Sequence, residues 1–480
     1  MRELQVEIAI IGAGTAGLTA YNAARKHTDD VVLIEDGPYG TTCARVGCMP
    51  SKLLIAAAER AHDARRAGLF GIEAKEVLVD GPRVLERVRS ERDSFVGSVL
   101  ASMEKIPADR KLRGRARFIA SMRLAVGDDL QLEAQRIIIA TGASPHVPDM
   151  LSHLGERLLV NDDVFELRGL PDSVAVFGCG VVGLELGQAL HRLGVRVRMF
   201  GRDGALAGIV DEEIRDYAEA CFNAELPLDT RADVKDIVPG DDGVTITFAH
   251  PQRGVVTEVF EYVLAATGRR PNLDALALQN SGLTLDERGI PDCDPATLQC
   301  TGQPVFVVGD ANNRAPFLHE AALEGRIAGD NAGRYPDVRP ATRQVPLSVT
   351  FSDPQIANVG MATAEICSAR GVEAVTGSSS FEGQGRSRVI GRNQGMLKVH
   401  ADCETGVFLG AEMFGPAAEH IGHLLAWSAQ QSLTVTDMLS MPFYHPVIEE
   451  GVRTALKDCK DRLDRVSAGE DPCLSCGPGS

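Results

Sequence analysis

Residues 7–17 read Glu-Ile-Ala-Ile-Ile-Gly-Ala-Gly-Thr-Ala-Gly, a short β-forming run that leads directly into three glycines in the pattern G-x-G-x-x-G. A helical stretch follows, and a second apolar run at residues 31–34 ends in Glu35. Strand, glycine turn, helix, strand and acid at this spacing are typical of a dinucleotide-binding βαβ unit. The glycines would let the backbone approach a pyrophosphate at the helix N-terminus, and Glu35 would bind a ribose hydroxyl. These glycines are Gly12, Gly14 and Gly17.

The same unit occurs a second time. Residues 173–183 read Ser-Val-Ala-Val-Phe-Gly-Cys-Gly-Val-Val-Gly, again an apolar run followed by the glycine pattern and a helix. Both units are followed by an apolar run that ends in Ala-Thr-Gly, at residues 140–142 and 266–268. Two such units predict two bound dinucleotides. The residues concerned are Gly178, Gly180 and Gly183 in the second glycine turn, and Thr141, Gly142 and Gly268 at the strand ends.

The two units differ where their second strand ends. Glu35 closes the first, whereas the matching position of the second is Gly201, which is followed by Arg202. Loss of the acid removes repulsion toward a 2′-phosphate, and an arginine can bind that phosphate. The sequence therefore favours NADP(H) in the second unit. The alternative is that Arg202 is a solvated surface residue.

Two cysteines lie close together at Cys43 and Cys48, where residues 43–52 read Cys-Ala-Arg-Val-Gly-Cys-Met-Pro-Ser-Lys. In an ideal helix, Cα atoms five residues apart are about 8.7 Å apart, whereas a disulfide needs less than about 7 Å. If the two cysteines pair, the helix must be distorted, and Gly47 is the residue that allows the bend. A Cys48 thiolate would lie against helix N–H groups and near Lys52, and both lower a thiol pKa. The alternative is a pair of buried small hydrophobic residues.

The other cysteines are scattered, and an odd total of 11 argues against a structural disulfide scaffold. We expect seven of them to be buried single residues: Cys179, Cys221, Cys293, Cys300, Cys367, Cys403 and Cys459. The last two, Cys473 and Cys476, lie in a glycine- and proline-rich tail that predicts flexibility. Their CxxC spacing is typical of a redox or metal site. A mobile dithiol shuttle, incidental metal capture and disorder without function remain open.

Two further stretches are candidates for function. Residues 305–310 form an apolar run that ends in Gly309-Asp310, where the aspartate could hold hydroxyl groups of a flavin side chain or belong to an ordinary turn. Near the C-terminus, His445 precedes a proline, and Glu450 falls in the helix expected to follow. A histidine oriented by a carboxylate suits the base half of a Cys–His pair. An ordinary loop is the alternative for His445.

Length and composition limit the possible functions. The chain has 480 residues, which suggests about three domains. Its formal net charge of −17 argues against nucleic acid or an anionic membrane as a partner. No stretch of about 20 apolar residues predicts a membrane span, and the acidic residues near Met1 are unlike a signal peptide. We therefore expect a cytoplasmic protein.

The motifs follow one another along the chain in this order: the first nucleotide unit, the cysteine segment from Thr42 to Lys52, the second nucleotide unit, Gly309-Asp310, and the stretch from His445 to Glu450. In these motifs the chain resembles the flavin-dependent pyridine nucleotide–disulfide oxidoreductases, and within them the dihydrolipoamide dehydrogenase branch most. The resemblance covers about residues 5–465. It implies an α/β fold with two Rossmann-like dinucleotide-binding domains and a C-terminal α+β dimerisation domain. The implied boundaries are 1–147 and 276–340 for FAD binding, 148–275 for NAD(P) binding, 341–465 for dimerisation and 466–480 for a flexible CxxC tail.

The resemblance also implies a role for each matching residue. Cys48 would be the thiol nearest the flavin, Cys43 would exchange with the substrate, and Lys52 would lie beside the flavin and pair with Glu185. His445, oriented by Glu450, would be the acid/base contributed by the partner subunit of a homodimer with a shared active site. No metal site is implied. The implied binding residues for FAD and NAD(P)H together are Gly12, Gly14, Gly17, Glu35, Thr42, Lys52, Thr141, Gly142, Gly178, Gly180, Gly183, Glu185, Arg202, Gly268, Gly309 and Asp310.

The implied activity is electron exchange between NAD(P)(H), FAD, the Cys43–Cys48 disulfide and a small-molecule or lipoyl-domain dithiol/disulfide. Departures from the family pattern concern Thr41, where a glycine is usual, and Arg45, Val447-Ile448 and Gly201. They keep two alternatives open. One is an NADPH-dependent reductase of another disulfide or of a thiol-bound metal, as in glutathione or mercuric reductases, that uses Cys473 and Cys476 as a relay. The other is a flavin-binding structural subunit without turnover.

Overall fold

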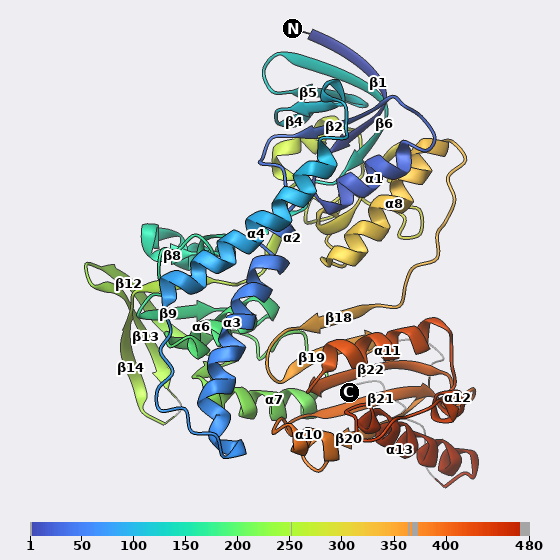
Figure 1. The fold of residues 1–480 in the computed structure, drawn as a ribbon. Helices are drawn as coiled ribbons and strands as arrows, with labels where there is room; N and C mark the ends of the chain where they lie inside the picture. Colours follow the sequence, from blue (N-terminus) through green and yellow to red (C-terminus); the bar gives the residue numbers. More distant parts are fainter. Residues whose placement is uncertain (1, 251, 363–364, 367–372, 471–480) are drawn as a thin grey trace.

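The computed structural model describes residues 2–250, 252–362, 365–366 and 373–470. Figure 1 shows three groups of elements: a sheet that contains the N-terminus, a second sheet beside the long helices α3 and α4, and a C-terminal sheet with its own helices. The architecture is α/β, with two nucleotide-binding-type sheets and one antiparallel sheet. None of the described helices is both long and apolar enough to cross a membrane.

The first sheet has seven strands in the order β3-β2-β1-β6-β5-β4, and β17 also pairs with β6. The neighbours of β1 and the β17–β6 pair are parallel, whereas β4, β5 and β6 form an antiparallel meander. The alternating pattern of β1 fixes its register, because Ile8 and Ile10 pack on one face and Ala9 and Ile11 on the other. The strands are β1 (Arg2–Ile11), β2 (Val31–Glu35), β3 (Lys111–Arg113), β4 (Ala116–Ala120), β5 (Arg123–Val126), β6 (Leu130–Ile139) and β17 (Val305–Val307).

Helices α1 (Thr15–Ala24) and α8 (Leu318–Arg334) lie side by side on the first sheet (Figure 1). Two other helices lead from this sheet toward the second: α3 (Cys48–Arg66) and α4 (Gly81–Met103). The one-turn helix α2 (Thr42–Arg45) precedes α3. The cysteine segment therefore lies between the two nucleotide-binding sheets.

The second sheet is parallel, with the order β11-β10-β9-β15-β8. Helices α6 (Val181–Arg192) and α7 (Glu212–Glu225) follow β9 and β10. An antiparallel meander β12-β13-β14 and a two-stranded link β7–β16 complete this part. The strands are β7 (Ala143–Pro145), β8 (Leu158–Leu159), β9 (Ser173–Phe177), β10 (Arg196–Phe200), β11 (Leu228–Asp229), β12 (Asp233–Gly240), β13 (Gly243–His250), β14 (Gly254–Phe260), β15 (Tyr262–Ala265) and β16 (Arg269–Pro271).

The C-terminal sheet is antiparallel, in the order β18-β19-β22-β21-β20. Its apolar face shares one core cluster with the helices that follow. The elements are β18 (Leu347–Thr350), β19 (Gln355–Gly360), β20 (Ala374–Ser380), α10 (Gly385–Val389), β21 (Met396–Asp402), β22 (Phe408–Gly415), α11 (Ala418–Gln430), α12 (Val435–Ser440) and α13 (Glu450–Ser467).

Candidate active site

A cavity of about 760 Å³ opens at the carboxyl ends of β1, β2 and β6. This edge of a parallel nucleotide-binding sheet is where ligands bind, and the volume is that of a site for a large organic ligand. Arg45 and Arg269 line it from two sides and offer positive charge. Six of the residues predicted from sequence also line it: Gly12, Gly14, Glu35, Thr42, Thr141 and Gly142.

The first glycine turn is shaped by close backbone contacts. A Cβ at Gly12 (φ +107°) would lie 2.2 Å from the Ala140 carbonyl oxygen, and one at Gly17 would lie 1.9 Å from the Gly12 carbonyl oxygen. A Cβ at Gly14 would meet no described atom within 4 Å, so this glycine leaves room for a ligand. The Glu35 carboxylate accepts hydrogen bonds from the N–H groups of Ala13 (2.7 Å) and Gly37 (2.8 Å). The turn and the acid therefore form one rigid unit.

Two polar groups near this cavity match a bound FAD. The Thr141 hydroxyl is buried and has no hydrogen-bond partner among the described residues; a buried polar group of this kind usually has one. Asp310, in the turn after β17, has a pKa raised by burial, an effect that Arg269 partly offsets. A buried carboxylate needs hydrogen-bond donors, and hydroxyl groups of a ligand can supply them. The residues present therefore fit FAD.

The two cysteines of the motif lie in separate helices. Helix α2 ends at Arg45 and α3 begins at Cys48, so the chain breaks at Val46-Gly47, as a contact between the two thiols requires. A Cβ at Gly47 would lie 3.1 Å from the Thr42 carbonyl oxygen, closer than most side chains tolerate. The small residue at 47 therefore permits the close approach of the two turns.

The Cys43 and Cys48 thiols act on each other, and each is the largest cause of the other's shifted pKa. The neighbouring Cys43 thiol and the charge of Lys52 lower the pKa of Cys48 to about 6, against the opposing effect of burial. The pKa of Cys43 is raised by the neighbouring Cys48 and by partial burial. At neutral pH, Cys48 is therefore a thiolate and Cys43 a thiol.

Lys52 lies one turn beyond Cys48 on α3 and reaches the second sheet. Its Nζ is 2.6 Å from the buried Glu185 carboxylate on α6 and lies over the Phe351 ring, 4.6 Å from the centroid. The other Glu185 oxygen accepts the Phe351 backbone N–H at 2.9 Å. Three segments far apart in the sequence thus meet beside Cys48.

Glu185 begins a row of buried polar side chains along α6, continued by Gln188 and Arg192. Gln188 binds the backbone of Asp353 through both its amide oxygen (2.9 Å) and its amide nitrogen (2.8 Å). Arg192 donates to the Asp353 carboxylate (2.9 Å) and carbonyl oxygen (3.2 Å). Spacings of three and four place these side chains on one helix face, and together they hold residues 351–353.

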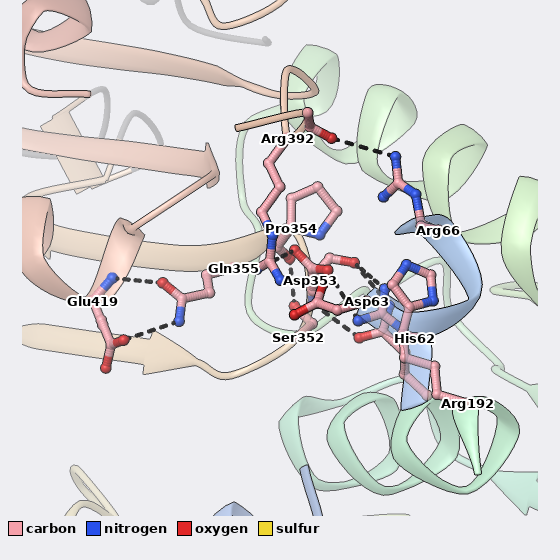
Figure 2. A network of polar contacts seen from close by, with 12 residues as sticks. His62, Asp63, Arg66, Arg192, Ser352, Asp353, Pro354, Gln355, Arg392 and Glu419 are labelled. Carbon is pink, nitrogen blue, oxygen red and sulfur yellow. Dashed lines mark hydrogen bonds and ion pairs between the residues drawn. The ribbon is translucent and has the colours of Figure 1, made fainter. Parts of the chain in front are cut away.

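Arg192 is also the centre of a charged junction between three parts of the molecule (Figure 2). It binds both oxygens of Glu225, and Arg392 joins Asp353 (3.5 Å) to Asp63 on α3 (2.9 Å). Burial raises the pKa of Asp353 and of Glu225, but the arginines hold both below their usual values. Sequence reasoning missed this junction. Its signal was the polar residues at 185, 188 and 192, which lie on one face of a largely apolar helix.

The second glycine turn copies the first. A Cβ at Gly178 (φ +112°) would lie 2.3 Å from the Ala266 carbonyl oxygen, and one at Gly183 would lie 2.0 Å from the Gly178 carbonyl oxygen. Gly180 faces open space, as Gly14 does. The last predicted residue of this unit, Gly268, has φ +109°.

The predicted 2′-phosphate end of the second unit is solvent-exposed. A Cβ at Gly201 would lie 2.6 Å from the Thr230 carbonyl oxygen, so this position has no room for an acid. The Arg202 side chain is 89% exposed and bonded to Asp203. Arg198 is bonded to Glu258 and is thereby occupied.

His445 lies between α12 and α13 of the C-terminal part, and its side chain is 79% exposed. Its Nδ1 is 3.0 Å and 3.1 Å from the two oxygens of Glu450, the first residue of α13. Glu450 also accepts the Val447 N–H (3.2 Å), and it has a pKa lowered mainly by the contact with His445. Among the described residues of one chain, His445 makes no hydrogen bond or ion pair with Cys43 or Cys48.

The expectation of seven buried single cysteines is wrong in part. Cys293 and Cys300 face each other across an isolated antiparallel bridge. Cys221 is only half-buried, and Cys403 is bonded in a disulfide. Cys179 and Cys459 are buried, as expected. The remaining predictions, for Cys367 and for the tail with Cys473 and Cys476, lie outside the described residues.

Comparisons with known proteins agree with this geometry. The family model described as pyridine nucleotide-disulphide oxidoreductase matches residues 6–325, and the model of that family's dimerisation domain matches residues 346–456. The chain is 31% identical to a dihydrolipoyl dehydrogenase of Halobacterium salinarum, covering 94% of this chain and 95% of the relative. It is also 31% identical to a mercuric reductase of Streptomyces lividans, covering 92% and 93%. A crystal structure of LpdA from Mycobacterium tuberculosis has a TM-score of 0.80 at 25% identity, covering 95% of this chain and 99% of that one.

Both sheets, the thiol pair and these matches over most of the chain lead to one assignment. The chain belongs to the pyridine nucleotide-disulphide oxidoreductase family, whose enzymes use FAD and NAD(P)H, and within it the chain is dihydrolipoyl dehydrogenase-like.

Proposed function

We propose that this enzyme exchanges electrons between a nicotinamide dinucleotide and a lipoyl-type dithiol or disulfide. The observation that carries the proposal is the Cys43–Cys48 thiol pair between the FAD-type cavity and the Lys52–Glu185 ion pair. Bound FAD supplies the hydride and electron transfer that links the nicotinamide to this thiol pair. The roles of the individual residues and the domain boundaries given above are part of the proposal.

The two thiols divide the sulfur chemistry between them. A Cys43 thiolate attacks one sulfur of the substrate disulfide, so that a mixed disulfide forms and the other substrate sulfur leaves as a thiolate. Cys48 then attacks the Cys43 sulfur, which closes the Cys43–Cys48 disulfide and releases the second substrate thiol. Cys43 needs a base because its pKa is raised, and the leaving thiolate needs a proton.

We assign that proton transfer to His445 of the partner subunit. The family's dimerisation domain and the exposed His445–Glu450 pair support a homodimer with a shared site. Subunit mixing tests this. Dimers reconstituted from equal amounts of Cys43→Ser and His445→Gln chains should regain about a quarter of wild-type activity. About half of these dimers contain both chains, and each such dimer has one intact site of two. If the mixture stays as inactive as either parent, the shared site is excluded.

For the nicotinamide, we propose a preference for NADP(H), supported by the lack of room for an acid at Gly201 and by the neighbouring Arg202. The measurement is kcat/KM for NADPH against NADH. Arg202→Gln should lower the value for NADPH alone, whereas a change that affects both nucleotides equally contradicts this role.

Steady-state assays with lipoamide, oxidised glutathione and mercuric ion test the substrate. Lipoamide turnover at least tenfold above the others is the expected result. Faster reduction of mercuric ion would favour the second candidate, which the Streptomyces lividans relative and the CxxC tail support. In that case Cys473→Ser should slow the reaction, whereas unchanged rates would exclude the tail as a relay.

A further inference from the structure

A second thiol pair lies in the FAD-binding part of the molecule, away from the substrate thiols. Cys293 and Cys300 are opposite each other across an isolated antiparallel bridge and are 5% and 2% exposed. Both belong to the core cluster that also contains Leu276, a residue lining the dinucleotide cavity. The activity proposed above uses neither cysteine.

The hydrogen bonds around the pair define its geometry. The N–H of Asp294 donates to the Gln299 carbonyl oxygen (3.0 Å), and the N–H of Thr301 donates to the Asp292 carbonyl oxygen (3.2 Å). These backbone hydrogen bonds flank the two cysteines on both sides, and Cys293 and Cys300 exchange no backbone hydrogen bond with each other. The two residues are therefore a non-hydrogen-bonded pair of the antiparallel bridge. Its Cα atoms lie about 4.5 Å apart in antiparallel strands. That separation is within the range of about 4.4–6.8 Å that disulfides span.

The two thiol groups influence each other. Cys293 is the largest cause of the raised pKa of Cys300, as expected for two neighbouring thiols. The hairpin is fixed at its tip, because the Asp294 carboxylate accepts the N–H groups of Ala296 and Thr297 at 2.8 Å each. A sulfur–sulfur bond therefore needs little movement of the backbone.

We propose that Cys293 and Cys300 are a second redox-active pair, which a small neutral peroxide such as hydrogen peroxide converts to a disulfide. The Cys293 sulfur attacks one peroxide oxygen, the O–O bond breaks, and a sulfenic acid and one water form. The Cys300 sulfur then displaces hydroxide from the oxidised sulfur, its proton goes to that hydroxide, and a second water leaves. Two thiols lose two electrons, and one peroxide is reduced to two waters.

The surroundings decide which oxidants react and in what order. Both cysteines are buried, whereas Asp292 and Asp294, the chain neighbours of Cys293, are exposed. The pair is therefore close to the surface, where a small molecule can reach it and a bulky disulfide cannot. The pKa of Cys300 is raised by the neighbouring Cys293 and by burial, whereas that of Cys48 is lowered to about 6. The Cys43–Cys48 pair should therefore react first and Cys293–Cys300 second.

The new bond would stiffen the part of the chain that leads to Asp310. The Cys293 carbonyl oxygen accepts a hydrogen bond from the Arg314 guanidinium. The Arg314 N–H in turn donates to the Asn312 side chain at 3.0 Å, within the turn that holds Asp310. Oxidation should therefore raise the thermal unfolding temperature of the holoenzyme, by about 3 °C.

Peptide mass spectrometry of the peroxide-treated holoenzyme tests the pair directly. Trypsin releases residues 289–314 as one peptide that contains both cysteines, because Arg288 and Arg314 are the nearest cleavage sites. After denaturation and N-ethylmaleimide treatment, a growing fraction of this peptide should be about 2 Da lighter than the dithiol form and carry no maleimide. If the peptide stays doubly alkylated, or is oxidised to sulfinic acid instead, the proposal is overturned.

Two controls isolate the effect. Cys300→Ala should abolish both the mass loss and the rise in unfolding temperature, and a rise that persists in this variant contradicts the stiffening. The buried single residue Cys459 reports on non-specific oxidation, and its peptide should stay alkylated at the same peroxide dose. These readouts do not depend on turnover, so they can fail or succeed whatever the substrate of the enzyme is.

Discussion

The two nucleotide-binding units have the same glycine turns but hold their first helices in opposite ways. Helix α1 packs against α8 through small residues: a Cβ at Gly325 would lie 2.2 Å from the Ala16 carbonyl oxygen, and one at Gly329 would lie 2.3 Å from that of Ala20. Helix α6 instead presents Glu185, Gln188 and Arg192, which bind residues 351–353 by hydrogen bonds and ion pairs. One helix is held by close apolar contact and the other by buried charge.

The difference follows from what each helix must contact. Helix α1 packs within its own domain, where close packing suffices. Helix α6 is next to segments from two other parts of the chain and carries the partner of Lys52. A buried polar row costs desolvation unless every group is bonded, but it fixes relative position more narrowly than apolar contact does. The polar helix α6 therefore connects the second unit to the thiol pair, whereas the apolar contact of α1 holds the first unit itself together.

The largest expected effect comes from breaking the close packing of the first unit. Gly325→Val puts carbon atoms where the Ala16 carbonyl oxygen lies, and neither backbone can yield without moving α1. We expect a loss of about 5 kcal/mol in stability and loss of FAD. Thermal unfolding and visible absorbance of the purified protein measure both.

Two controls make this test specific. Arg326→Ala on the exposed side of α8 should change the stability by less than about 0.5 kcal/mol. Gly187→Ala on α6 would meet the flexible Met199 sulfur at 3.1 Å, and it should cost less than about 1 kcal/mol. If Gly325→Val loses little stability, α1 and α8 are not held together by close backbone contact.

Arg192→Met should have the next largest effect, because it leaves the Glu225 and Asp353 carboxylates buried beside each other. We expect about 3 kcal/mol of destabilisation at pH 7, at the low end for a broken buried pair, because Gln188 and Arg392 continue to bind these carboxylates. Chemical denaturation at a series of pH values measures it.

The pH dependence of this loss has a definite sign. Both carboxylates have lowered pKa values in the folded protein, so their stabilisation is present above their unfolded values of about 3.9 and 4.3. It is lost as the pH falls through the lowered values. The gap between wild type and Arg192→Met should therefore narrow below about pH 4. A constant gap down to pH 3 would mean that Arg192 stabilises through packing alone.

The row on α6 should also influence the thiol chemistry, by a smaller free energy. Lys52 lowers the pKa of Cys48 and Glu185 raises it, so two substitutions should act in opposite directions. Lys52→Met should raise the pKa of Cys48 from about 6 by about one unit, and Glu185→Gln should lower it by about half a unit. The rate of iodoacetamide alkylation of the reduced enzyme against pH reports both. Arg326→Ala in the first unit should shift nothing, and an equal shift there would remove the distinction between the units.

Much of this comparison could be predicted from sequence. The repeated glycine pattern is local, and its close contacts follow from spacing within one βαβ unit. The bend at Gly47 could also be predicted, because helix geometry separates residues five apart by more than a disulfide allows. The contact of Lys52 with Glu185 required the resemblance to a family, since nothing in the local pattern connects these positions.

The rest depends on register between distant segments. Gln188 and Asp353 are separated by 165 positions, and no periodicity in α6 says which segment will cover its polar row. The pairing of Cys293 with Cys300 depends on a single isolated bridge in a short hairpin, where a shift by one residue would point one thiol to solvent. Sequence patterns report which face a residue occupies, but not what lies opposite it.

The smallest expected effect concerns a residue that the second unit avoids. The turn after β10 uses a glycine at positive φ, Gly204 (+78°), whereas the first unit carries Thr41 at φ +61° and ψ +148° immediately before α2. Any residue other than glycine costs about 1–3 kcal/mol in this region. Thr41→Gly would lose the hydrogen bond that the Thr41 hydroxyl accepts from the Ala44 N–H (3.3 Å), and it would raise the entropy of the unfolded state. These two effects offset part of the stability that relief of the backbone strain provides. We expect a net stabilisation of about 0.5–1 kcal/mol, measured by chemical denaturation.

Thr41→Ser is the matched control, since it keeps the hydroxyl and the positive φ and should stay within about 0.3 kcal/mol of wild type. Thr41 lines the dinucleotide cavity, so FAD retention should be measured on the same samples. If Thr41→Gly is more stable but releases FAD faster, the strain at residue 41 serves to shape the cavity wall. If Thr41→Gly is less stable, the hydrogen bond of the hydroxyl outweighs the backbone strain. That single hydrogen bond would then explain why the first unit tolerates a side chain at positive φ, where the second unit has a glycine.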